Sequence, residues 1–246
     1  MSGGEVALWW LGVLPVALVG VPLVIARLPE PPPSAESAEA DTELGRMLRE
    51  EGPKELYRDI ARHPRLILWI AVIVGVLGSF AQEVLPARSA WAAAALTPVF
   101  ALLWIVDWRT RLLPRIVVRP LTAVVLLLAL LDWVVRRDTH TLVREVCGGA
   151  LAWLIFGLLW FVRRAGMGLG DVRLALPLGM LTAALSWNAW LTGLYAGFVG
   201  FAVFGVGLLL VKRDRGVLKR AYPFGPFMIG GAYVGLALAP HVHLIG

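Results

Sequence analysis

The sequence predicts an all-α membrane protein, a polytopic bundle of about eight transmembrane helices. Of its 246 residues, 59% are hydrophobic and only 16% are charged, and the mean hydropathy of +0.75 is far above that of a soluble domain. The apolar residues also come in runs whose length approaches the roughly 20 residues that a helix needs to cross a bilayer. These runs lack the alternation of a β-barrel, and a helix satisfies its own backbone polar groups in lipid.

Taken in order, the apolar runs predict spans at 6–26, 66–81, 90–106, 121–135, 147–162, 172–186, 189–211 and 225–240. They divide the chain into a first span at 1–26, a polar linker at 27–65 and a seven-helix membrane domain at 66–246. The first span has no basic residue before it and no small-residue cleavage site after it. We therefore expect it to be retained and not to be a secretory signal peptide.

The linker opens with "RLPEPPPSAESAEADTE", a composition that cannot bury a core and predicts an extended segment. Its second half carries a few spaced apolar residues on either side of a Gly-Pro break at 52–53. This pattern predicts two short amphipathic helices lying along the membrane surface. The residues concerned are Leu44, Met47, Leu48, Leu56 and Ile60.

Most of the 23 Lys and Arg residues fall in four segments, the linker and the loops after the third, fifth and seventh predicted spans. The positive-inside rule predicts that these segments face the cytoplasm and that both termini lie outside. Arg136, Arg137 and Arg144 are exceptions. Topology and anionic lipid account for the net charge of +6, so no nucleic-acid partner is expected. Cys147, the only cysteine, can form neither an internal disulfide nor a zinc cluster and is expected to be a small membrane-facing residue.

Four acidic residues lie inside or at the rim of predicted spans, where ionisable groups are costly and are functional candidates by default. Glu5 stands at the outer entrance of the first span and can reach water. Asp132 comes four residues before Arg136, which predicts a helical ion pair. The remaining two, Asp107 and Asp171, are harder to explain by structure alone.

Asp107 closes the third span, where the negative end of the helix dipole disfavours a carboxylate, although Arg109 and Arg111 could compensate it. Asp171 follows "GMGLG" and precedes the sixth apolar run, so it could be the N-cap of that helix. Three glycines in five residues exceed the needs of a cap. Gly166, Gly168 and Gly170 would permit positive backbone angles and the close approach of another chain.

The predicted topology puts both acids at cytoplasmic ends of spans, at similar depth. Two adjacent carboxyl groups in a medium of low dielectric constant share one proton, which supplies an acid and a base together. Aspartyl proteolysis uses such a pair, because the ionised member activates water while the protonated member polarises the peptide carbonyl.

With these residues in view, the sequence resembles the prepilin peptidases, or type IV leader peptidases, which are GxGD-type intramembrane aspartyl proteases. "GMGLGDVRLA" at 166–175 resembles their GxGD motif, and "IVDWRTRLLP" has Pro114 seven residues after the first aspartate. "VPLVIARLPEP" at 21–31 and "YPFGPFMIGGAYVGL" at 222–236 are similar to two further stretches of the family.

The resemblance implies a multi-pass protein of the bacterial inner membrane. Such an enzyme cleaves the basic leader of type IV pilin and pseudopilin precursors at the cytoplasmic face, without a metal or cofactor for proteolysis. It implies Asp107 and Asp171 as the catalytic pair. It also implies a group of substrate-positioning residues, namely Gly168, Gly170, Pro223, Phe224, Gly225 and Pro226.

Residues 27–65 lack the paired Cys-x-x-Cys motifs that the family carries there for zinc. Many relatives also methylate the new pilin terminus, so S-adenosylmethionine would be needed only if methyl transfer is retained. Arg115 stands where Asn or Asp often follows the proline, and Arg173 replaces a usual Lys.

Three alternatives stay open from the sequence. A transporter or channel could use the two acids as a proton relay, although transporter sites usually lie at the bilayer midplane. A non-catalytic pilus or secretion assembly factor could use the linker for docking. A GxGD protease could also act on other membrane helices.

Overall fold

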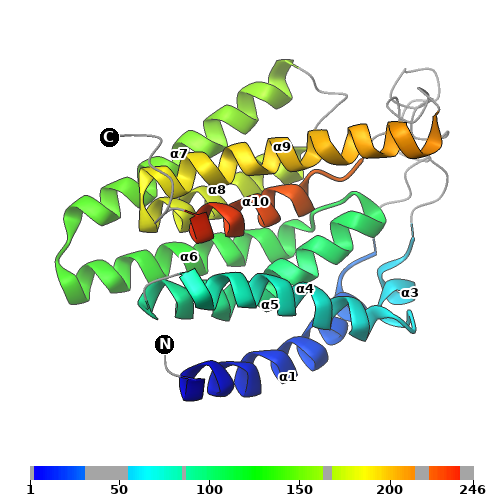
Figure 1. The fold of residues 1–246 in the computed structure, drawn as a ribbon, viewed down its shortest axis with the longest axis horizontal. Coiled ribbons are helices and arrows are strands. Elements are labelled where there is room, and N and C mark those ends of the chain that lie inside the picture. The colour runs from blue at the N-terminus through cyan, green and yellow to red at the C-terminus, as the bar shows by residue number, and fades with distance from the viewer. Residues whose placement is uncertain (1–2, 31–54, 85–86, 163–167, 214–221, 239–246) are drawn as a thin grey trace.

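The computed structural model describes residues 3–30, 55–84, 87–162, 168–213 and 222–238, and every regular element in these ranges is a helix (Figure 1). The all-α class predicted from the sequence is thereby confirmed. The helices are α1 Gly3–Arg27, α3 Tyr57–Ala61, α4 Leu66–Val84, α5 Ala87–Thr110, α6 Arg115–Arg136, α7 Thr139–Val162, α8 Leu169–Leu185, α9 Trp187–Lys212 and α10 Gly225–Leu238.

Each predicted span corresponds to one helix, but several helices extend beyond the apolar runs. The α5 helix continues to Thr110, while α6 already begins at Arg115 and α7 at Thr139. Hydropathy marks only the part of a helix that suits lipid, and long polar side chains at a helix end can reach the interface. Ser186 separates α8 from α9 and caps α9, because its hydroxyl oxygen accepts the Ala189 N–H at 3.0 Å.

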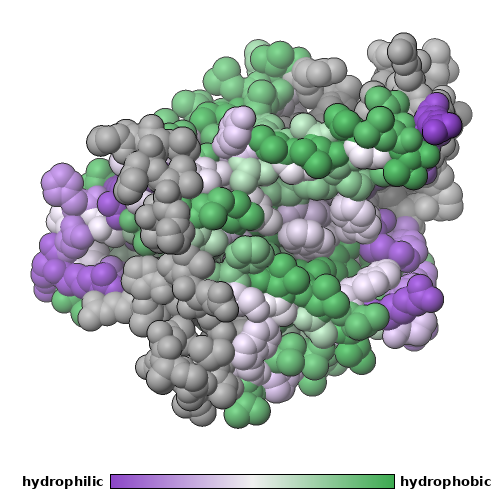
Figure 2. Space-filling model, viewed as in Figure 1, coloured by the Kyte–Doolittle hydropathy of each residue, from purple (hydrophilic) through white to green (hydrophobic). Residues whose placement is uncertain are grey.

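The helices have the apolar surfaces of a membrane protein. Among the described residues, α1, α6, α7 and α9 are long and apolar enough to cross a bilayer, and α4 and α10 contain shorter apolar helices. Figure 2 shows hydrophobic residues over the middle of one face and hydrophilic residues at its left and right ends. That distribution suits a chain whose helices run between two aqueous phases.

Glycines let two helix pairs pack at backbone distance. In α9, Gly193 and Gly197 face Gly231 and Gly235 of α10, and a Cβ atom on Gly231 would lie 2.4 Å from the Gly197 nitrogen. The α7 and α8 helices meet in a similar way. Small residues four apart on both partners are the usual device for close helix contact in membranes.

The second predicted linker helix exists as α3, but its apolar side faces the protein. Tyr57 and Ile60 are buried, and α3 packs against α1 and α5, whereas Leu56 is exposed. The bundle therefore covers the apolar residues of α3, and the expectation that this segment lies along the membrane surface stays a prediction. The first predicted linker helix, with Leu44, Met47 and Leu48, lies outside the described residues.

Candidate active site

Asp107 lies in the last turn of α5 and is buried, with 3% of its surface exposed. Its Oδ2 atom accepts a hydrogen bond of 3.0 Å from the backbone N–H of Gly225, the first residue of α10. The positive end of the α10 dipole thus points at the carboxyl group. A Cβ atom on Gly225 would lie 2.6 Å from the same oxygen, so only glycine leaves room for this contact.

Asp171 lies in the first turn of α8 and is 7% exposed. Its Oδ2 atom accepts the backbone N–H of Gly168 at 3.1 Å, and its own N–H donates to the Gly168 carbonyl at 3.1 Å. The N-cap position belongs to Gly168, so the suggestion that Asp171 is the N-cap is wrong. Asp171 is the third residue of the helix, and its carboxyl group accepts the N–H of the N-cap residue, Gly168.

Neither Gly168 nor Gly170, the two motif glycines that the structure describes, has a left-handed backbone conformation. Gly168 has a φ of −78°, and Gly170 lies within α8 without a positive φ. The expectation of positive backbone angles is therefore wrong for both residues, while Gly166 lies outside the described residues. Gly170 is needed for a different reason, since a Cβ atom there would lie 2.8 Å from the Cβ of Leu113.

Leu113 connects the surroundings of the two acids. Its side chain contacts Gly170 on α8, and its Cδ1 atom would lie 3.5 Å from a Cβ atom on Gly225. The two helices that carry Asp107 and Asp171, α5 and α8, also contact each other. Two buried carboxyl groups therefore occupy one site between α5, α8 and the start of α10.

The Pro-Phe-Gly-Pro segment joins this site to an aromatic cluster. Gly225 contacts Asp107, whereas the Phe224 ring packs against Phe198 at 5.2 Å and Phe201 at 5.1 Å between centroids. Pro223 is buried before the helix, and Pro226 is buried in its first turn, where a missing N–H costs nothing.

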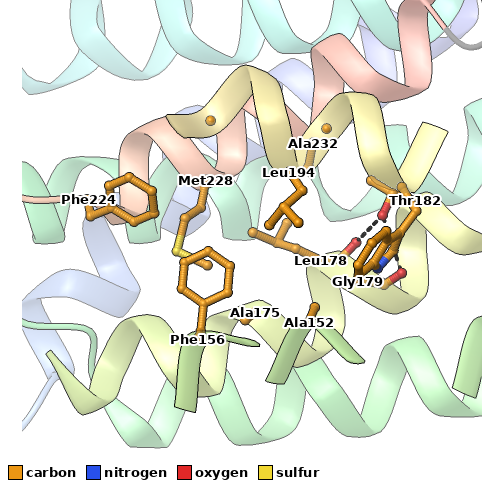
Figure 3. A pocket seen from close by; sticks show the side chains of 13 residues that line it. Ala152, Phe156, Ala175, Leu178, Gly179, Thr182, Leu194, Phe224, Met228 and Ala232 are labelled. Atoms are coloured by element: carbon orange, nitrogen blue, oxygen red, sulfur yellow. Dashed lines mark hydrogen bonds between the residues drawn. The ribbon is translucent and has the colours of Figure 1, made fainter. Parts of the chain in front are cut away.

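An apolar pocket lies beside Phe224, between α7, α8, α9 and α10. Figure 3 shows Phe224 and Met228 toward one end of the pocket and Thr182 toward the other. The polar groups near that second end are already satisfied, since the Thr182 hydroxyl donates to Leu178 O at 2.9 Å and the Trp190 indole donates to Gly148 O at 2.9 Å. The pocket therefore suits an apolar group.

Of the two arginines expected to offset Asp107, Arg109 has a different partner. The Arg109 Nε atom donates to Glu55 Oε2 at 2.6 Å, and the guanidinium lies 5.3 Å from the Trp69 ring centroid. The sequence had not singled out Glu55, nor Leu113, although Leu113 stands directly before the proline that follows Asp107. Among the described residues, no three His, Cys, Asp or Glu side chains are grouped so as to hold a metal ion.

Comparison with known proteins finds similarity to a peptidase family. The family model for the type IV leader peptidase family matches residues 94–211, a segment that contains both acids. Residues 94–211 are therefore similar to the type IV leader peptidase family. Two proteins of Aeromonas salmonicida, one from strain A449, are named "Prepilin leader peptidase/N-methyltransferase" and are each 31% identical over 178 residues.

The match covers 72% of this chain and 58% of each relative, so the chain spans less than two thirds of their length. No solved structure matches the chain significantly. The similarity points to a peptidase family, while the roles of single residues are argued from the site itself.

Proposed function

We propose that this protein is an aspartyl endopeptidase that removes the leader from type IV pilin-like precursors, with Asp107 and Asp171 as its catalytic pair. The observation that carries the proposal is the presence of two buried carboxyl groups in one site of a chain that is similar to the leader peptidases. Burying two carboxyl groups in one site is costly, and this cost is best explained by acid and base catalysis.

The pair carries one negative charge, because two close carboxylates in an apolar site cannot both ionise. The ionised member takes a proton from a water molecule as the water oxygen attacks the scissile carbonyl carbon. The protonated member donates a hydrogen bond to the carbonyl oxygen and stabilises the tetrahedral intermediate. The C–N bond then breaks, and a proton passes to the leaving amine. The proton belongs to the pair as a unit.

The cleavage takes place at the cytoplasmic face of a bacterial inner membrane. The segment at 109–119, which joins the end of α5 to the start of α6, is rich in arginine, and such connections between spans stay in the cytoplasm. The substrates are membrane-anchored precursors that present their leader on that side. No described residue is assigned to S-adenosylmethionine, and the methyl transfer named for the relatives is not part of the proposed function.

Co-expression with a pilin-like precursor, followed by mass measurement of its amino terminus, tests the proposal. Asp107→Asn and Asp171→Asn should each reduce cleavage below detection at unchanged protein level, since each removes one member of the proton-sharing pair. Asp132→Asn is the matched control, because Asp132 is an acid in a helix that is ion-paired with Arg136 at 2.7 Å, as the sequence predicted. It should cleave normally.

Cleavage by either site variant would refute the catalytic assignment. The relay and scaffold alternatives require no cleavage, so a wild-type protein that leaves the precursor intact would favour them.

A further inference from the structure

The end of the polar linker binds the end of the helix that carries Asp107. Glu55 accepts from Arg109, two residues after the acid, through both carboxylate oxygens. On its other side the Arg109 guanidinium covers the Trp69 ring of α4. A two-pronged pairing of guanidinium with carboxylate fixes orientation as well as distance.

Tyr57, two residues further on, reaches the same end of α5. Its side chain is 3% exposed, and its hydroxyl lies close to the Thr110 side chain, where α5 ends. Burial raises the pKa of Tyr57, so the hydroxyl keeps its proton and remains able to donate. Glu30, just after α1, holds this segment in place by accepting the Tyr57 N–H at 3.2 Å.

Thr110 in turn shapes the turn that leads to Leu113. Its hydroxyl donates to Val106 O at 2.8 Å and accepts the Leu112 N–H at 3.2 Å. Between them Arg111 adopts a left-handed φ of 54°. This turn delivers Leu113 to its contacts with Gly170 and Gly225, the residues next to the two acids.

We propose that Glu55 and Tyr57 are positioning residues, which set the end of α5 and its following turn so that Asp107 faces Gly225 and Asp171. The inference rests on the proposed peptidase function. The last residues of the linker hold the catalytic helix by direct contacts.

Loss of the contact between Glu55 and Arg109 is expected to lower the turnover rate more than the stability of the fold. The Glu55 carboxylate is 42% exposed and Arg109 is 27% exposed, and a pair this accessible contributes little to stability. Small errors in the placement of a catalytic group are expensive, however, since a displacement of about 1 Å can cost on the order of a hundredfold in rate.

The test uses the full-length protein in lipid vesicles with a purified pilin-like precursor. Glu55→Gln and Tyr57→Phe should each lower kcat about tenfold while KM stays within about twofold. Combining Glu55→Gln with Arg109→Gln should be no worse than the more damaging single change, because both remove the same contact. Arg62→Gln is the matched control, since Arg62 is an exposed residue that directly follows α3. Its kcat should be that of the wild type.

Failure of the wild-type protein to cleave would refute the proposed function. If the wild type cleaves, normal kcat in both Glu55→Gln and Tyr57→Phe would overturn the inference. A change confined to KM would also overturn it, because it would indicate substrate binding. If the kcat of the double variant fell by the product of the two single losses, the two residues would act independently, which would also contradict a shared contact. Both single changes nearly preserve the size of the side chain. A melting curve close to that of the wild type would show that a lower kcat comes from the site and not from unfolding.

Discussion

At the scale of single residues, Gly225 has two roles that only glycine can combine. Its N–H donates to Asp107 at 3.0 Å, and its missing side chain leaves the space in which that carboxyl group lies. Since 118 residues separate Gly225 from Asp107, the contact exists only in the folded bundle.

Gly225→Ala should therefore impair catalysis, although Gly225 has no side chain that could take part in the reaction. The new methyl group would lie 2.6 Å from Asp107 Oδ2, so the carboxyl group or the start of α10 must move. We expect kcat for precursor cleavage to fall at least tenfold. Gly205→Ala is the control, because nothing lies within 4 Å of a Cβ atom there. Equal activity of the two variants would show that this contact does not matter.

The sequence predicted the residues of the site better than their contacts. The resemblance named Asp107, Asp171 and Gly225, because motifs are local and survive in a linear string. Leu113 and Glu55 were missed, because their importance depends on what the fold brings beside them.

At the scale of helices, the apolar runs predicted where the helices lie but not which pairs touch. Hydropathy indicates which segments suit lipid, whereas helix pairing in lipid depends on how closely two surfaces can pack. The spacing of glycines therefore predicts the α9–α10 contact better than hydropathy does. Gly193 and Gly197, like Gly231 and Gly235, are four residues apart, a signal that was present in the sequence.

The α8 helix gains a cap from its neighbour α7, and this cap explains one exception to the charge distribution. Arg144 donates from Nε to Ala183 O at 2.6 Å and from its terminal nitrogen to Ala184 O at 2.9 Å. These carbonyl groups belong to the last turn of α8 and have no partner within the helix. A cation there also meets the negative end of the helix dipole.

Arg144→Met should destabilise the protein by about 1–3 kcal/mol, since it leaves two partly buried carbonyl groups without a charged donor. Thermal unfolding of the purified protein in detergent would measure the loss. Arg136→Met removes a cation from the exposed pair with Asp132 and should cost less than about 1 kcal/mol. Similar melting temperatures for the two variants would contradict the capping role.

At the scale of the whole molecule, the site is assembled at one end of the bundle from helices far apart in sequence. The matched family segment at 94–211 supplies α5 and α8, while α10 lies beyond it and contributes Gly225. Both acids lie at helix ends that are next to arginine-rich segments. The α6 helix begins at Arg115, near the end of the bundle that holds the site, and its other end, Arg136, lies at the opposite end of the bundle. The orientation of the bundle therefore decides which compartment the site faces.

That orientation can be measured with single cysteines, because Cys147 is the only native one. In a Cys147→Ser background, His140→Cys and Lys212→Cys place a thiol at exposed positions in the first turn of α7 and the last turn of α9. The positive-inside rule puts the first outside and the second in the cytoplasm. A membrane-impermeant maleimide should label the His140→Cys protein in intact spheroplasts and the Lys212→Cys protein only after lysis. The reverse pattern would place Asp107 and Asp171 on the outer side, where a leader held in the cytoplasm could not reach them.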